Sequence, residues 1–156
     1  MAGKIEARLQ ELGITLPKAN KAVANYVPYV ITGNLIFVSG QITMLDGELK
    51  YIGRYGENLS VEDGMAASRL CGLHLISQVK EAVGGDLDRI TRVVKLGGFV
   101  ASMPEFTDQP KIVNGASDLM VEVFGEPVGQ HARAAVGVAA LPLGVSVEID
   151  GVFEFA

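Results

Sequence analysis

The amino-acid sequence predicts a single α+β domain, in which a sheet of about six strands carries two long helices on one face. Apolar residues recur at helical spacing in two long segments of the chain. Stretches rich in β-branched residues lie before, between and after these segments. The resulting order, β-β-(β)-α-β-α-β-β, gathers the strands onto one sheet. Since residues 1–156 contain no linker or low-complexity tract, we expect one domain.

The first part of the chain is expected to form a short helix and then strands. Residues 2–12 carry an apolar stripe that predicts the helix. The Gly33-Asn34 pair predicts a tight turn between strands over Tyr29–Thr32 and Leu35–Thr43. A third strand, short and weak, is expected near Leu49–Ile52.

The first long helix is expected to begin after Ser60. Ser60 and Asp63 have the spacing of a capping box, in which each side chain binds the backbone N–H of the other residue. The apolar stripe continues to about Val83, and two glycines then end the helix. A strand is predicted over Arg89–Ser102, because this segment is rich in β-branched residues.

The last part of the chain is expected to form the second long helix and two further strands. Asp108 is predicted to cap this helix, which ends at Phe124 before a glycine. The two strands lie between His131 and Ala156. A turn around Leu141–Gly144 is expected to join them as neighbours in the sheet.

Composition predicts a cytoplasmic oligomer. Apolar residues make up 49% of the chain and charged residues 20%, which suggests extra surface buried between subunits. The net charge of −5 comes without a basic cluster and argues against a nucleic-acid surface. We expect no membrane span and no signal peptide. A single cysteine, Cys71, fits a reducing compartment.

Arg133 is the main candidate for a functional residue. It lies at the start of an apolar strand, where its permanent charge needs an anionic partner or full hydrogen bonding. The acidic residues downstream are Glu148, Asp150 and Glu154. From spacing alone, a structural ion pair with one of them and a site for an anionic ligand remain equally open.

We expect no catalytic histidine, metal site or cofactor site in the sequence. His74 lies within an apolar helical pattern and is interpreted as a packed residue, and His131 as a residue at a pocket rim. Cys71 and His74 lack a third ligand at a suitable spacing, so no metal site is predicted. The glycines form no phosphate-binding loop, and we expect no cofactor.

Several motifs resemble those of the YjgF/Rid family, which is also called the L-PSP endoribonuclease family. The resemblance covers about residues 20–155. The segments that match the family in general are Asn34-Leu-Ile-Phe-Val-Ser-Gly-Gln41, Val100-Ala-Ser-Met-Pro-Glu-Phe106, Leu141-Pro142 and Val147-Glu-Ile149. The resemblance is greatest to a branch of the family that also shares Asn25-Tyr-Val-Pro28, Asn114-Gly-Ala-Ser-Asp118 and His131-Ala-Arg-Ala-Ala-Val-Gly-Val138.

The resemblance implies a chorismate-mutase-like fold and a homotrimer whose clefts are shared between neighbouring subunits. In deaminase members of the family, the residue matching Arg133 binds the substrate carboxylate, and the residue matching Glu148 positions the attacking water. The matches for substrate binding are Tyr26, Gly40, Asn114 and Ala135.

This chain departs from the family pattern at four places, one of which is a pair of extra residues between Asn114 and Arg133. Ala135 stands where many deaminase members have a cysteine, and Ser117 replaces an aromatic residue of the second long helix. An extra N-terminal helix is expected over residues 1–13. These differences change the size and polarity of the pocket and leave the substrate open.

The resemblance therefore predicts a hydrolase that converts reactive carboxylated imines or enamines to 2-keto acids and ammonia, without a cofactor. One alternative is a trimer that binds a small carboxylate or keto acid without turnover. Another is an endoribonuclease, which the acidic charge and the lack of a histidine pair oppose.

Overall fold

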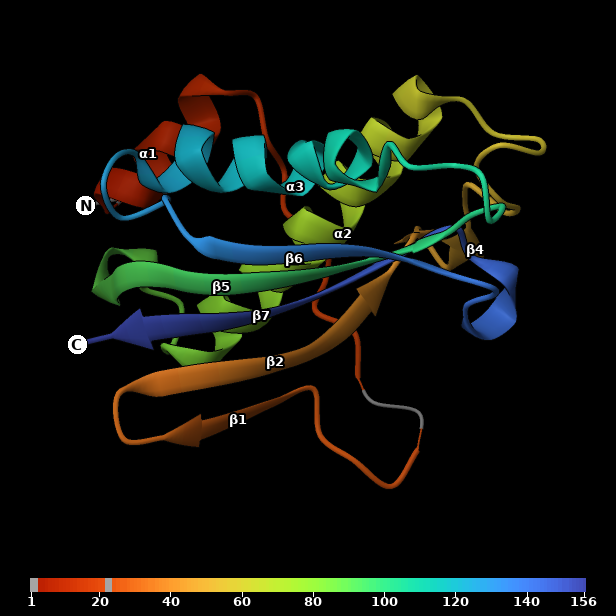
Figure 1. Cartoon of the computed structure of the whole chain (residues 1–156). Coiled ribbons are helices and arrows are strands. Elements are labelled where there is room, and N and C mark those ends of the chain that lie inside the picture. Colours follow the sequence, from red (N-terminus) through yellow and green to blue (C-terminus); the bar gives the residue numbers. More distant parts are fainter. Residues whose placement is uncertain (1–2, 22–23) are drawn as a thin grey trace.

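The computed structural model describes residues 3–21 and 24–156, and its main feature is a five-stranded mixed sheet (Figure 1). The strands lie in the order β1-β2-β7-β5-β6, and a separate hairpin consists of β3 and β4. The strands are β1 (Tyr29–Thr32), β2 (Leu35–Ile42), β3 (Met44–Leu45), β4 (Glu48–Leu49), β5 (Ile90–Ala101), β6 (Ala132–Val138) and β7 (Val147–Phe155). The helices are α1 (Lys4–Glu11), α2 (Val61–Ala82) and α3 (Gln109–Phe124), with short 3-10 turns at Leu87–Arg89 and Pro142–Gly144.

Both long helices cover the same face of the sheet, so the predicted α+β class is confirmed. Helix α2 packs on β7 and β2, while α3 packs on β5 and β6. In Figure 1, α2 passes behind the strands and α3 lies along β6. The core between the two layers consists of apolar side chains from both, including Ile36, Leu75, Leu119 and Phe153.

The other face of the sheet presents apolar side chains to solvent. Phe37 alternates with the buried Ile36 and Val38 along β2, and 45% of its surface is exposed. Val30 on β1 and Val136 on β6 are exposed to 52% and 46%. A strand whose two faces are both apolar is typical of a sheet covered on both sides.

The predicted sixth strand is wrong. Residues Glu48–Leu49 pair only with Met44–Leu45, in a hairpin apart from the main sheet. Tyr51 has a φ of +54°, a left-handed conformation that interrupts an extended strand. Ile52 makes only an isolated bridge to Val145.

The expected pairing of the last two strands is also wrong, because β5 lies between them. Strand β5 pairs in parallel with β6 and antiparallel with β7. The parallel pair arises because α3 carries the chain back across the face between β5 and β6. Strand β7 takes the centre of the sheet, where Val147, Ile149 and Phe153 are fully buried.

The two long helices begin in different ways. The capping box of α2 is confirmed: Ser60 Oγ accepts from the N–H of Asp63, and the Asp63 carboxylate accepts from the N–H of Ser60, each at 3.1 Å. Asp108 precedes α3 but its side chain caps no backbone N–H, so this prediction is wrong. Its backbone is not extended, and its carboxylate instead lies 3.4 Å from Lys111 Nζ.

The N-terminal helix is confirmed over Lys4–Glu11, while residues 1–2 of the predicted range lie outside the described residues. Its first turn is held by an acidic residue from elsewhere in the chain. The Asp88 carboxylate accepts the N–H groups of Lys4 and Ile5, both at 2.8 Å. These two donors lower the pKa of Asp88. The Asp88 carboxylate therefore caps the N-terminus of α1, a role that usually falls to the residue directly before a helix.

Candidate functional site

Arg133 lies on β6 with its side chain against α3. One of its terminal nitrogens, Nη1, donates to Asn114 Oδ1 at 2.8 Å and to Ser117 Oγ at 3.1 Å. Asn114 and Ser117 are three residues apart on α3 and therefore share a face of the helix. Within residues 3–21 and 24–156, no carboxylate lies within ion-pair distance of Arg133. A structural ion pair with the downstream acids is thus not formed in the chain.

His131 joins the same group of side chains. Its Nε2 lies 2.9 Å from Ser117 Oγ, and its Nδ1 lies 2.7 Å from the carbonyl oxygen of Gly129. The sequence did not predict this contact between a serine and a histidine. The two residues are separated by the end of α3 and the loop to β6, and only the strand order brings them together.

Ala135 follows Arg133 on the same side of β6. Side chains alternate along a strand, so positions 133 and 135 both point to the helical layer. Ala135 is partly buried and packs against the core. Arg133, Asn114, Ser117, His131 and Ala135 are named the arginine cluster below.

Glu148 lies in a separate cavity of about 320 Å³. The cavity is lined by the segment between α1 and β1, by β2 and β3, by the 3-10 turn at Pro142–Gly144 and by the start of β7. Its lining includes Tyr26, Ser39, Gly40, Gln41, Leu143 and Glu148, which are named the glutamate cavity below. Burial raises the pKa of Glu148, and the nearby Asp150 carboxylate raises it further.

Gly40 leaves the space that the Glu148 carboxylate occupies. A side-chain Cβ built at position 40 would collide with Glu148 Oε1 and Cδ. Gly40 lies where the pairing of β2 with β7 shifts, between Val38 and Gln41. This irregularity brings the backbone of β2 close to the carboxylate.

The arginine cluster and the glutamate cavity lie on opposite faces of the sheet. Arg133 points to α3, as its hydrogen bonds show. Glu148 lies between Val147 and Ile149, whose side chains are fully buried under the helices, so it points the other way. The structure therefore brings Tyr26, Gly40 and Glu148 together, and Arg133, Asn114 and Ala135 together, but does not join the two sets within one chain.

The remaining candidates have structural partners. His74 is buried, as expected of a packed histidine, and its Nε2 lies 2.6 Å from the carbonyl oxygen of Met44. The Cys71 thiol is fully buried and contacts the carbonyl oxygen of Val147. Among residues 3–21 and 24–156, no three histidine, cysteine or acidic side chains gather as metal ligands. None of the helices in this part of the chain has the length and apolar composition needed to cross a membrane.

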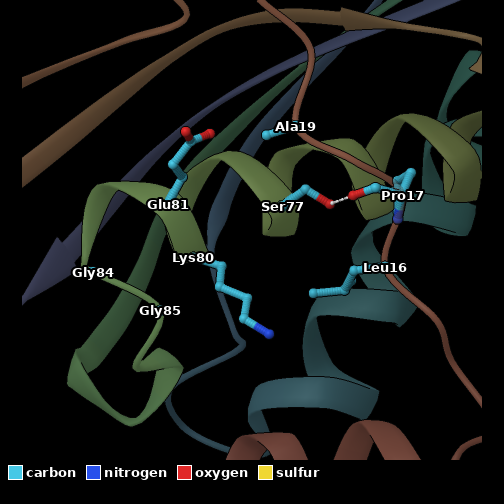
Figure 2. Close-up of a pocket in the computed structure, with 8 residues that line it drawn as sticks. All are labelled: Leu16, Pro17, Ala19, Ser77, Lys80, Glu81, Gly84 and Gly85. Carbon is cyan, nitrogen blue, oxygen red and sulfur yellow. Dashed lines mark hydrogen bonds between the residues drawn. The ribbon is translucent and has the colours of Figure 1, made fainter.

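A larger cavity, of about 510 Å³, lies between α2 and the segment after α1 (Figure 2). Ser77 Oγ donates to the carbonyl oxygen of Pro17 at 2.7 Å and so ties this segment to α2. Lys80 lines the same cavity in Figure 2. Its ammonium group forms an ion pair with Glu6. Because this lysine is already paired, we assign no ligand to the cavity.

Comparison with known proteins places these features in a family. The profile of the family described as "YjgF/chorismate mutase-like, putative endoribonuclease" matches residues 6–154. Protein TCP17 of Trypanosoma cruzi is 51% identical over 153 residues, which cover 98% of this chain and 95% of TCP17. A 2-iminobutanoate/2-iminopropanoate deaminase of Homo sapiens is 30% identical over 141 residues, covering 89% of this chain and 86% of the deaminase. The crystal structure of a protein of unknown function from Agrobacterium tumefaciens matches with a TM-score of 0.90 at 52% identity, covering 97% of this chain and 92% of that one.

Proposed function

Because the chain belongs to the YjgF/chorismate mutase-like family, we propose that it is a deaminase, which hydrolyses carboxylated imines or enamines to 2-keto acids and ammonia. The relative named 2-iminobutanoate/2-iminopropanoate deaminase supports this reaction class. The observation that carries the proposal is the guanidinium of Arg133, which is fixed on one side and has no acidic partner among the described residues.

Arg133 is suited to bind a carboxylate. Its Nη1 is held by Asn114 and Ser117, whereas its Nε and Nη2 have no partner within residues 3–21 and 24–156. These two nitrogens form the edge of the guanidinium fork that binds a carboxylate in a bidentate manner. The side chain is thus oriented before a ligand arrives, which lowers the entropic cost of binding.

Glu148 is suited to activate water. Its raised pKa makes the carboxylate a better proton acceptor near neutral pH than an exposed glutamate. Water attacks the carbon of the protonated imine, C=NH₂⁺, while Glu148 removes a proton from the water, which leaves a neutral carbinolamine. Glu148 then returns this proton to the nitrogen, and the C–N bond breaks as the C=O bond forms and the hydroxyl proton passes to the leaving ammonia. The sum is protonated imine plus water giving keto acid plus ammonium.

The two groups have to meet between copies of the chain, since they lie on opposite faces of the sheet. The exposed apolar face around Phe37 and Val136 offers a surface for such association. We therefore propose that the protein is a homotrimer, in which the arginine cluster of one subunit completes the glutamate cavity of the next.

A complementation experiment tests both parts of the proposal. An amino-acid oxidase generates an imine in solution, and release of keto acid is followed with Arg133→Ala, with Glu148→Gln, and with the two variants unfolded and refolded together. Each variant alone should be inactive. In a random mixture, about a quarter of the sites combine an intact arginine with an intact glutamate, and activity should return to that extent.

Full activity of Arg133→Ala would contradict the carboxylate anchor. Inactive variants that fail to complement would instead contradict a site shared between subunits. Keto-acid binding to the native protein without any turnover would favour the alternative of a non-catalytic carboxylate-binding protein, because the arginine cluster is complete without Glu148.

A further inference from the structure

Leu143 has a backbone conformation that leucine rarely adopts. Within the 3-10 turn Pro142–Gly144, its φ is +61° and its ψ is 11°. In this left-handed region the Cβ of an L-residue crowds the following carbonyl oxygen, and glycine is the residue that fits without strain. Strained non-glycine residues persist where the surrounding structure imposes the conformation, and they cluster at functional sites. The turn thus holds a leucine where local folding favours a glycine.

The Leu143 side chain also contributes little to the packed core, because the exposed fraction of the residue is 69%. Backbone hydrogen bonds hold the turn instead. The N–H of Gly53 donates to the carbonyl oxygen of Gly144 at 3.2 Å, and the N–H of Val145 donates to that of Pro142 at 3.3 Å. Replacing the side chain of Leu143 should therefore leave the turn in place.

Leu143 lines the glutamate cavity, in which one part of the substrate still lacks an assigned place. The carbon that water attacks in a 2-imino acid carries a carboxylate, a nitrogen and a side chain. In the proposed mechanism, the carboxylate binds the arginine cluster of the adjacent subunit, and water reaches the carbon beside Glu148. The side chain of the substrate is then left to occupy the rest of the glutamate cavity.

Part of the lining that remains for this side chain is apolar. It consists of Pro28, Ile42, Met44, Pro142 and Leu143. Lys21 also lines the cavity, but it borders a neighbouring cavity beside α2 as well. The volume of about 320 Å³ is within the range of sites that hold drug-sized ligands. It is therefore larger than a methyl or ethyl group requires, and its apolar wall favours an apolar substituent.

We propose that Leu143 determines which imine side chain the glutamate cavity accepts, and that the cavity favours branched or aromatic apolar groups such as isobutyl and benzyl. The inference rests on the proposed function, because it takes the substrate to be anchored by Arg133 and attacked beside Glu148. It adds a substrate class to that function, namely imines derived from the larger apolar amino acids. The exposed leucine presents apolar surface that such a substrate removes from water.

This selectivity can be measured without turnover, because stable 2-keto acids carry the same carboxylate and side chain as the imines. Calorimetry on the full-length protein would compare 4-methyl-2-oxopentanoate, which has an isobutyl group, with pyruvate, which has a methyl group. The native protein should bind 4-methyl-2-oxopentanoate more tightly. Leu143→Gly should reduce this affinity ratio about tenfold and change the affinity for pyruvate little, since loss of a small apolar contact in a pocket has an effect of that order.

Stability provides a second readout, which distinguishes this role from a structural one. Leu143→Gly relieves the left-handed backbone and should not lower the midpoint of urea unfolding, whereas loss of a packed leucine would lower it. Leu143→Asn tolerates the left-handed region but replaces the apolar surface with an amide, so it should also lose the preference. Asp46→Gly is the matched control, because Asp46 has a φ of +52° in the exposed turn between β3 and β4, outside the glutamate cavity. It should keep the native affinity ratio.

Three results would contradict the role of Leu143. The first is an unchanged affinity ratio in Leu143→Gly. The second is a smaller assembly of this variant in sedimentation, which would make Leu143 a contact between subunits. The third is tighter binding of 2-oxoglutarate, whose side chain carries a carboxylate, than of 4-methyl-2-oxopentanoate, which would assign the selectivity to Lys21.

The same experiment separates this inference from the proposed function. Selective keto-acid binding that depends on Leu143, without hydrolysis of any imine, would contradict the deaminase and support the role of Leu143. Imine hydrolysis with an affinity ratio that does not depend on Leu143 would support the deaminase and contradict the role of Leu143. A native protein that binds none of these keto acids would overturn the role of Leu143 and the carboxylate anchor together.

Discussion

Some residues of the candidate site could be predicted from the sequence, and others could not. Arg133 and Glu148 could be singled out, because a charge in an apolar strand requires an explanation. The grouping of Ser117 with His131 could not, because it depends on β6 lying beside α3. Their sequence separation alone gives no signal for contact.

The raised pKa of Glu148 leads to a prediction about stability. A carboxyl group whose pKa is raised by folding binds protons more tightly in the folded state, so it favours folding at low pH and opposes it as the pH rises through that pKa. Glu148→Gln should therefore raise the free energy of unfolding at pH 8, and this gain should shrink toward pH 4. Urea titrations across that range measure it.

The matched control for this prediction is Glu105→Gln, which removes the same charge from an exposed position. It should change stability little at either pH. An equal gain in both variants would mean that net charge, rather than burial of Glu148, causes the effect.

At the scale of elements, most helices and strands could be predicted from the sequence, but the order of the strands in the sheet could not. The bounds of α2, α3, β1 and β2 follow from apolar spacing and cap residues, which are local signals. The order of strands is not local. Consecutive strands are usually neighbours, and β6 and β7 are an exception because β5 pairs with both.

Close contact between α2 and α3 depends on glycine. A Cβ at Gly115 would collide with the backbone carbonyl of Met65, which cannot move without shifting α2. Gly115→Ala should therefore destabilise the protein by about 1–3 kcal/mol, as other overpacked cores do. Gly72→Ala is the control, since its Cβ would meet mainly the flexible end of Leu119 and should cost less. Denaturant unfolding of the two variants gives the comparison.

His74 should make stability depend on pH. Burial lowers the pKa of His74, although its hydrogen bond to Met44 partly opposes this. As the pH falls below about 6.5, His74 therefore becomes protonated in the unfolded chain before it does in the folded protein. The free energy of unfolding decreases over this range, until the pH falls below the pKa of His74 in the folded protein. His74→Gln should show a smaller loss of melting temperature between pH 7 and pH 5. A loss equal to that of the native protein would exclude His74 as the cause.

At the scale of the whole molecule, the apolar outer face of the sheet should control assembly. Phe37→Asp places a charge on this face and should separate the proposed trimer into single chains, which sedimentation would detect. Imine hydrolysis should be lost with it. Met65→Asp, an exposed apolar position on α2, is the control and should leave assembly intact.

The placement of the arginine cluster and the glutamate cavity on opposite faces of one sheet has a consequence for how the proposed activity varies with the amount of protein. Under the proposed shared site, a single chain has no complete site of its own, so turnover per molecule would be set by the equilibrium between free and associated chains. On dilution below the dissociation constant of the assembly, specific activity should fall, although every chain stays folded. The protein would then respond to its own abundance and work only where enough of it has accumulated.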